Sequence, residues 1–149
     1  MNHPRYTVQE SISRLHFEFI SEGPRGRIRK VVDYSLIEEL NLWNLGFGDY
    51  NPQSRTVDDQ IVSDNGDVRK VLATVIFTLN EFLIAKPDAI VFFTGSNTLR
   101  TRLYGRIIRQ QYPNFSSQFL VEGVNEDGTT EEFDSQRHYS AFLISSKIL

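Results

Sequence analysis

The residues from 94 to 104 have the types and spacing of an anion-binding junction. A continuous apolar run of strand length, residues 89–94, leads directly into Gly95, Ser96 and Asn97, where a helical pattern opens. Ligands gather beyond the carboxyl ends of strands, and a helix N-terminus offers free N–H groups and partial positive charge. The sequence therefore predicts a ligand site formed by Thr94, Gly95, Ser96, Asn97, Arg100 and Arg102.

Within this segment, Arg100 and Tyr104 are the main candidates for ligand binding and catalysis. At about 100° per residue, Arg100 falls on the apolar arc of the helix within its first turn, so its guanidinium would be held inward. There it could form two parallel hydrogen bonds with a phosphate or carboxylate, and Tyr104, one turn later, could donate its hydroxyl to the same pocket. In the alternative interpretation, Arg100 pairs with a structural carboxylate such as Asp49, and Tyr104 is a core aromatic residue.

Two basic stripes suggest a wider binding surface. One follows a predicted strand and the other a predicted helix face: Arg25, Arg27, Arg29 and Lys30, and Arg102, Arg106 and Arg109. Such segregation of charge could form a face for a nucleic acid or an acidic protein partner. A charged edge strand and a solvated helix face would explain the two stripes separately.

No residue pattern indicates a metal site. Five aspartates between residues 49 and 67 could bind Mg²⁺ or Ca²⁺, but they lack the calcium-loop pattern, and helix capping is the favoured explanation. The three histidines, His3, His16 and His138, lack zinc-ligand spacing, and no nucleophile motif accompanies them. We therefore expect no metal.

Composition excludes several classes of protein. The chain has 149 residues, no cysteine and a formal net charge of −3. The lack of cysteine excludes a disulfide partner and thiolate chemistry. No apolar run approaches the roughly 18 residues of a membrane helix, and the first residues lack the apolar core of a secretory signal. We expect a cytoplasmic protein without a membrane partner.

The periodicity predicts the elements that position these residues. Alternating or continuous apolar patterns predict strands over residues 16–21, 27–37, 42–50, 89–94, 118–124, 130–133 and 139–145. Helical spacing predicts one helix from residue 68 to the Lys86-Pro87-Asp88 stop and another from about 95 to 112, before Pro113. The expected fold is α+β: a mixed, largely antiparallel sheet with one β-α-β crossover and two main helices. Residues 1–15 are expected to form an N-terminal arm, and residues 16–149 a single domain.

Several segments resemble a family of small bacterial proteins of unknown function that is common in Bacteroidetes. The resemblance covers most of the chain and lies in FISEGPRGRIRKVVDY (19–34), FGDY (47–50), NGDVRKVLATV (65–75), TGS (94–96) and RTRLY (100–104). It implies a bacterial cytosolic context and no particular activity.

The predicted topology is also similar to the second half of the GCN5-related acetyltransferase fold. In that fold's pyrophosphate loop, Q/R-x-x-G-x-G/A, the matching residues here are Ser63, Gly66 and Val68, and only Gly66 agrees. This single match does not identify a cofactor, so the cofactor remains unknown. Asn97 and Leu103-Tyr104 resemble a later segment of the fold, which implies that Tyr104 is a catalytic general acid.

The leading hypothesis is a protein that binds the phosphate of a nucleotide-like ligand or nucleic acid at the 94–104 junction. An extension of this hypothesis is that the protein is a transferase-like enzyme. The alternative is a noncatalytic interaction module that binds a protein partner, such as one component of a toxin–antitoxin or phage-defence pair.

Overall fold

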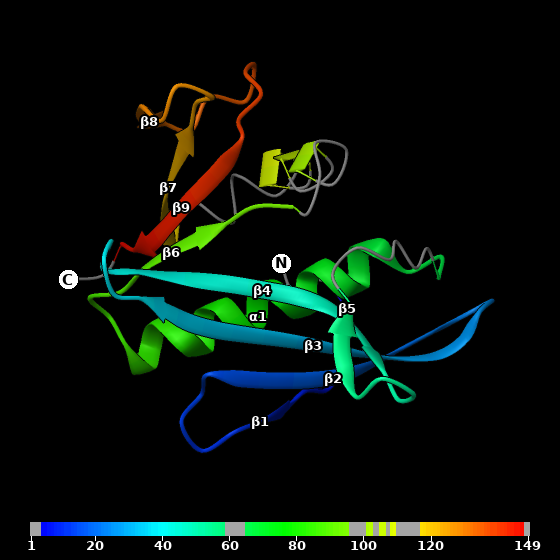
Figure 1. Ribbon diagram of the computed structural model, residues 1–149. Helices are drawn as coiled ribbons and strands as arrows, with labels where there is room; N and C mark the ends of the chain where they lie inside the picture. Colours follow the sequence, from blue (N-terminus) through cyan, green and yellow to red (C-terminus); the bar gives the residue numbers. More distant parts are fainter. Residues whose placement is uncertain are drawn as a thin grey trace. The chain divides into compact units, whose positions relative to one another are not determined.

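The computed structural model describes residues 4–58, 65–95, 101–102, 105–106, 108–109 and 117–147. The chain forms two compact units (Figure 1). Unit 1 contains Met1–Ser35 and Gly46–Ala85, and unit 2 contains Leu36–Leu45 and Lys86–Leu149. Strands β3 (Gly26–Ile37) and β4 (Leu42–Asn51) contribute residues to both units.

Unit 1 is an antiparallel sheet with one helix. Its hydrogen-bonded order is β1 (Gln9–Glu10), β2 (His16–Gly23), β3 and β4, and β5 (Thr56–Asp58) pairs with β4. Along β2, Phe17, Phe19 and Ser21 are buried, because alternate side chains of a strand point to the same face. The opposing residues of β3 are Val32, Lys30 and Ile28, so they share that face.

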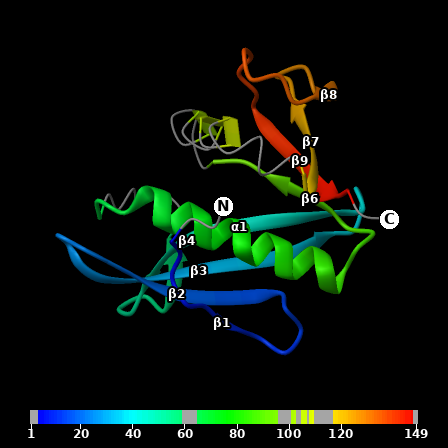
Figure 2. The same cartoon turned by 180° about the vertical axis from the view of Figure 1, so that it is seen from behind.

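Helix α1 (Val68–Ala85) covers this buried face, as Figure 2 shows from behind. Its inward side is apolar at helical spacing, with Val71, Leu72, Val75, Leu79, Phe82 and Leu83 buried. Asp67 precedes the first helical residue, and its carbonyl accepts a 2.9 Å hydrogen bond from the Val71 amide. Its carboxylate accepts hydrogen bonds of 2.5 Å from Tyr6 and Ser21, which joins the start of the helix to the sheet.

Asn65 fastens the β2–β3 hairpin to the start of α1. Its fully buried side chain donates to Ser21 Oγ and to the Gly26 carbonyl, and accepts from the Arg25 amide at 2.7 Å. Gly23 permits this approach, because a Cβ there would lie 1.9 Å from the Asn65 carbonyl oxygen. The Asn65-Gly66-Asp67 segment is therefore a structural junction within unit 1.

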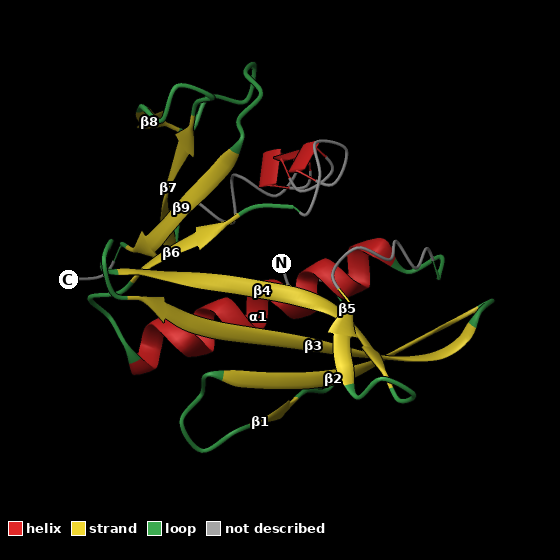
Figure 3. Ribbon diagram, viewed as in Figure 1, coloured by secondary structure: helices red, strands yellow, loops and turns green. Residues whose placement is uncertain are grey.

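Unit 2 is a second sheet region, with strands that lie side by side in Figure 3. The first residues of β4 pair in parallel with β6 (Ile90–Phe93), followed by antiparallel β9 (Ala141–Ser146), β7 (Phe119–Val124) and β8 (Thr130–Glu132). One face buries Val91, Phe93, Val121, Phe142 and Ile144. Helical backbone at residues 101–102, 105–106 and 108–109 accompanies this face, since a Cβ on Gly105 would lie 3.2 Å from the Phe142 ring.

The structure confirms a mixed α+β fold with a largely antiparallel sheet. The parallel β4–β6 pair, separated along the chain by α1, is the predicted crossover. The rest of the predicted second helix, between residues 95 and 112, lies outside the described residues, so this helix and the acetyltransferase likeness remain predictions. The expected N-terminal arm supplies β1 and the buried ring of Tyr6 to unit 1. No helix in the described part of the chain has the length and apolarity to cross a membrane.

Candidate ligand-binding site

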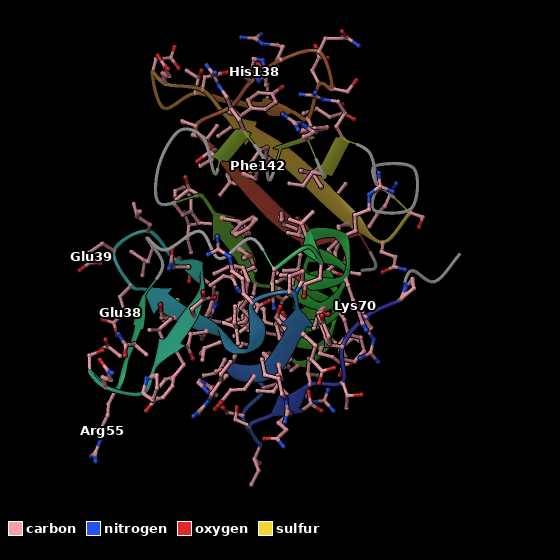
Figure 4. All side chains as sticks on the ribbon, turned by 90° about the vertical axis from the view of Figure 1, so that its right-hand side faces the viewer. Glu38, Glu39, Arg55, Lys70, His138 and Phe142 are labelled. Carbon is pink, nitrogen blue, oxygen red and sulfur yellow. The ribbon has the colours of Figure 1, made fainter. Side chains whose placement is uncertain are left out.

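A cavity of about 760 Å³ lies in unit 2, where loops follow β6 and β7 and precede β9. Its described lining comes from the residues after β6, the helical segment, the β7–β8 turn and the segment before β9: Thr94, Gly95, Thr101, Arg102, Asn125, Glu126, Asp127, Thr129, Glu131, Arg137, His138, Tyr139 and Ser140. Figure 4 labels His138 in this lining and Phe142 on β9. Every one of these lining residues except Gly95 has a polar side chain, so the cavity suits a polar ligand.

Short hydrogen bonds hold the residues that follow β6. Thr94 Oγ1 donates to the Ser140 carbonyl at 2.8 Å, which connects this segment to the start of β9. The Gly95 amide donates to Thr101 Oγ1 at 3.1 Å. Thr101 is buried, so this bond connects the junction to the helical segment. These contacts fix the cavity wall from which Arg102 extends.

Glu131 is the centre of a hydrogen-bond cluster at the cavity. Its Oε1 accepts from Asn125 Nδ2 at 3.1 Å, and its Oε2 accepts from the Tyr139 hydroxyl at 2.9 Å. Arg137 forms an ion pair with it, with Nη1 3.1 Å from Oε1. The hydrogen bonds from Asn125 and Tyr139 lower the pKa of Glu131. The carboxylate is therefore ionised at neutral pH and is surrounded by donors from three points of the chain.

Tyr139 connects this cluster to the core of unit 2. Its hydroxyl accepts from the Asp134 amide at 2.9 Å while donating to Glu131. Burial, with the hydrogen bond to Glu131, raises the pKa of Tyr139, so the phenol stays protonated as a donor. Its ring lies directly on Gly123, where a Cβ would come within 2.3 Å of ring carbons. Gly123 therefore determines the position of Tyr139.

The β7–β8 turn places a second carboxylate at the cavity. Asp127 Oδ1 accepts from the Thr129 amide at 2.9 Å and from the Thr129 hydroxyl at 2.6 Å. These bonds lower the pKa of Asp127, which is therefore ionised at neutral pH. Gly128 has a φ of 87°, a conformation that favours glycine in such a turn. Asp127 and Gly128 thus lie in the turn that joins the paired strands β7 and β8.

The described lining contains two arginines and three carboxylates. Arg137 pairs with Glu131, whereas Arg102 is exposed and has no hydrogen bond or ion pair with any residue that the structure describes. Within the described part of the chain, the donors of Arg102 are therefore not engaged by the protein and are available to a ligand. Glu126 and Asp127 give the opposite charge to other parts of the lining.

Three residues of the predicted ligand site, Thr94, Gly95 and Arg102, line this cavity together. Four others, Ser96, Asn97, Arg100 and Tyr104, lie outside the described residues. Arg106 is exposed, and the Nε of Arg109 is buried without a hydrogen-bond partner in the described chain. Neither is among the described lining residues.

The N-terminal basic stripe is largely paired with acids. Arg27 Nε lies 3.6 Å from Glu22, and Arg29 forms a short ion pair with Glu18; Arg25 is exposed. Lys30, which was predicted to belong to this exposed basic stripe, is not at the surface. It lies on the buried face of the sheet, 5% exposed, with Nζ 2.5 Å from Asp49. The reason is its position opposite Phe19, which directs its side chain toward the core.

Glu131, Arg137 and Tyr139 line the cavity, and none of them was among the predicted site residues. A signal was present in Gly123 and Tyr139, because a strand glycine commonly marks the close approach of another group. The contact between Gly123 and Tyr139 depends on the pairing of two strands, which cannot be deduced from one sequence.

Among the described residues, no group of three or more histidine, aspartate and glutamate side chains is arranged to hold a metal ion. The two carboxylates beside His16 illustrate this arrangement. Asp33 contacts its Nδ1 and Glu18 contacts its Nε2 at 2.8 Å, so the two carboxylates lie on opposite sides of the ring. They bind the imidazole rather than a common centre.

Comparison with known proteins places the chain in a family. No curated protein and no solved structure matches it. A family model described as "Family of unknown function (DUF6934)" matches residues 2–147, nearly the whole chain and both units. This agrees with the resemblance of the sequence to a family without an assigned activity. The chain is therefore a member of the DUF6934 family.

Proposed function

We propose that unit 2 binds a small polar molecule through an anionic group, a phosphate or a carboxylate, in the cavity beside Thr94 and Arg102. The observation that carries this proposal is the guanidinium of Arg102, which has no hydrogen-bond or ion-pair partner among the described residues and lies at the wall of a cavity of about 760 Å³. Arginine forms paired hydrogen bonds with both kinds of oxyanion. Ligand cavities commonly measure about 300–1,000 Å³, so the volume suits a small molecule.

The charges of the lining favour a small ligand over a nucleic acid. Glu126, Asp127 and Glu131 place three carboxylates around the same cavity. A polyanion would meet this repulsion along its length, whereas nucleic-acid sites are basic throughout. A small molecule can direct its anionic group to Arg102 and hydrogen-bond donors to the carboxylates. Transferase-like chemistry with Tyr104 as a general acid is an extension of this proposal, with the cofactor still unassigned.

The test compares Arg102→Gln with Arg106→Gln, an exposed arginine of the same helical segment that is not among the described lining residues. Calorimetric titrations use inorganic phosphate, glycerol phosphate, citrate and a short RNA. Loss of a charge-assisted hydrogen bond of about 1.5–3 kcal/mol should weaken phosphate or carboxylate binding roughly 10- to 100-fold in Arg102→Gln. Arg106→Gln should bind like the wild type. Equal affinities in all three proteins, or tight binding of RNA alone, would contradict the proposal.

A second candidate, the noncatalytic interaction module, has one specific observation in its favour. Ile90 on β6 and Leu120 on β7 both stand opposite Ser145 of β9, so they share a face of the sheet in unit 2. They are 41% and 52% exposed. Exposed apolar side chains that lie together are typical of protein interaction sites. Mixing with the product of a neighbouring gene, followed by gel filtration, tests this function; Leu120→Ser should weaken any complex that forms.

A further inference from the structure

We infer that Glu131 is a positioning residue that holds Arg137 as the second anion-binding side chain of the cavity in unit 2. This inference rests on the proposed function and extends it, because it assigns a ligand-binding role to a residue outside the predicted 94–104 site. Both side chains line the cavity, and Arg137 Nη1 lies 3.1 Å from Glu131 Oε1.

The guanidinium of Arg137 keeps unused donors. A guanidinium has five N–H groups in a rigid planar fork, and the ion pair with Glu131 is formed through Nη1. The side chain is 54% exposed, so an arginine without a tether would occupy many conformations. Fixing one end of the fork reduces the entropy that is lost when the other end binds an oxyanion.

Glu131 is itself fixed before it can fix Arg137. Asn125, from the turn after β7, donates to one carboxylate oxygen, and Tyr139, from the segment before β9, donates to the other. Tyr139 is buried on Gly123 and receives the Asp134 amide. A continuous series of contacts therefore runs from the core of unit 2 through Tyr139 and Glu131 to the guanidinium of Arg137.

The charge of Glu131 makes its role testable, because orientation and electrostatics predict opposite results. Its carboxylate accepts two hydrogen bonds, from Asn125 and Tyr139, and forms an ion pair with Arg137. As a negative charge at the cavity, it opposes the binding of an anion. If charge alone mattered, its removal would strengthen anion binding. If it positions Arg137, its removal weakens anion binding although the cavity becomes more positive.

The experiment measures inorganic phosphate binding by calorimetry in Glu131→Ala, Glu131→Gln and Arg137→Gln, with Glu132→Ala as the matched control. Glu132 is an exposed carboxylate on the same strand and is not among the described lining residues, so Glu132→Ala should bind phosphate as tightly as the wild type. Glu131→Ala and Arg137→Gln should each weaken binding about tenfold, the value of one lost hydrogen bond to a charged group. Glu131→Gln keeps a side-chain oxygen for Arg137 and removes the negative charge, so it should bind phosphate more tightly than Glu131→Ala.

A double variant and a milder one complete the design. Arg137→Gln added to Glu131→Ala should cause little further loss, because the two residues act as a unit. If Glu131→Ala does not fold, as judged by its thermal unfolding, Tyr139→Phe replaces it. This change removes one donor to Glu131 and should weaken phosphate binding by a smaller factor.

Several results would overturn the inference while leaving the proposed function intact: tighter phosphate binding by Glu131→Ala, wild-type affinity in Arg137→Gln, or unchanged affinity in Tyr139→Phe. Absence of phosphate or carboxylate binding by the wild-type protein would overturn the proposed function, and this inference with it.

Discussion

The ring of Tyr34 on β3 stacks on the ring of Phe82 in α1, with centroids 4.3 Å apart and an interplanar angle of 5°. The Tyr34 hydroxyl also lies 2.9 Å from Thr78 Oγ1, one helical turn from Phe82. Phe82 has no exposed surface, and Tyr34 is 3% exposed. This pair is the closest described ring contact between the helix and the sheet of unit 1, so it should contribute strongly to stability.

Phe82→Ala should lower the free energy of unfolding by about 3–5 kcal/mol, because a large ring leaves the packed core and the space does not fully close. Chemical denaturation monitored by circular dichroism measures this change. Ile84→Ala is the control on the same helix: its side chain is 60% exposed, and its loss should cost less than about 1 kcal/mol. Similar losses in both variants would mean that the helix is not held by this stacking.

Removing one partner of the buried Lys30–Asp49 ion pair should destabilise the protein strongly, whereas replacing both partners with apolar residues should not. Asp49→Ala would leave the ammonium of Lys30 buried without its carboxylate, and should destabilise the protein by about 3–5 kcal/mol. The double variant Lys30→Met/Asp49→Leu removes both charges and should recover most of that loss.

Urea denaturation of the single and double variants decides this prediction. Arg27→Met provides the exposed comparison, since its contact with Glu22 spans 3.6 Å between largely exposed side chains. It should change stability by less than about 1 kcal/mol. A double variant no more stable than Asp49→Ala would show that packing around Lys30, and not the loss of its Asp49 partner, causes the loss of stability.

His16 should give unit 1 a pH-dependent stability. Partial burial alone would lower the pKa of His16, but hydrogen bonds with Glu18 and Asp33 outweigh it and raise the pKa above 6.5. Only the imidazolium has an N–H on both ring nitrogens and can donate to both carboxylates. Because the folded-state pKa exceeds the unfolded value, the stabilisation is complete below pH 6.5 and is lost as the pH rises through the folded pKa.

The stability advantage of the wild type over His16→Gln should therefore shrink as the pH rises from about 6 to 8. Its size should stay below about 1 kcal/mol, since the His16 ring is 42% exposed and solvent screens the pair. Thermal unfolding across this pH range, with His138→Gln as a control outside the His16 cluster, measures the effect. An advantage that grew with pH would contradict the imidazolium assignment.

Gly123→Ala should disturb the Glu131 cluster through Tyr139. The new methyl group would meet ring carbons of Tyr139 at 2.3 Å, and overpacking of this kind typically costs about 1–3 kcal/mol. The displaced phenol would also lose its place beside Glu131. Leu120→Ala, on the same strand with a half-exposed side chain, should cost less than about 1 kcal/mol. Thermal unfolding and the tyrosine signals in NMR spectra report both changes; a Gly123→Ala protein with wild-type stability would exclude a tight contact.

The sequence by itself determined the local elements of this protein. Alternation along residues 27–37 correctly separates Val32 and Tyr34, which are buried, from Arg29 and Ser35, which are exposed. The 3.6-residue spacing from Val68 onward predicts α1, whose apolar side lies against the sheet. These features can be predicted from the sequence because the period of a strand or helix determines which neighbouring side chains share a face.

Part of the candidate site was also predictable. The junction after the apolar strand contributes Thr94, Gly95 and Arg102 to one cavity, because the end of a strand and the start of the next element are adjacent in both chain and space. The Asp127-Gly128 turn was likewise evident from its residue types. What these local features could not supply was the identity of the residues facing them.

Only the tertiary structure decided the long-range partnerships. Lys30 was predicted in a basic stripe, but it is buried and pairs with Asp49, which lies on another strand, 19 residues later. Glu131 and Tyr139 belong to two separate predicted strands, with Arg137 between them in the sequence; they form one cluster because β7 pairs with both β8 and β9. A periodic pattern specifies the face on which a residue lies, whereas the register between strands specifies which residue it meets, and that register depends on the packing of the whole sheet.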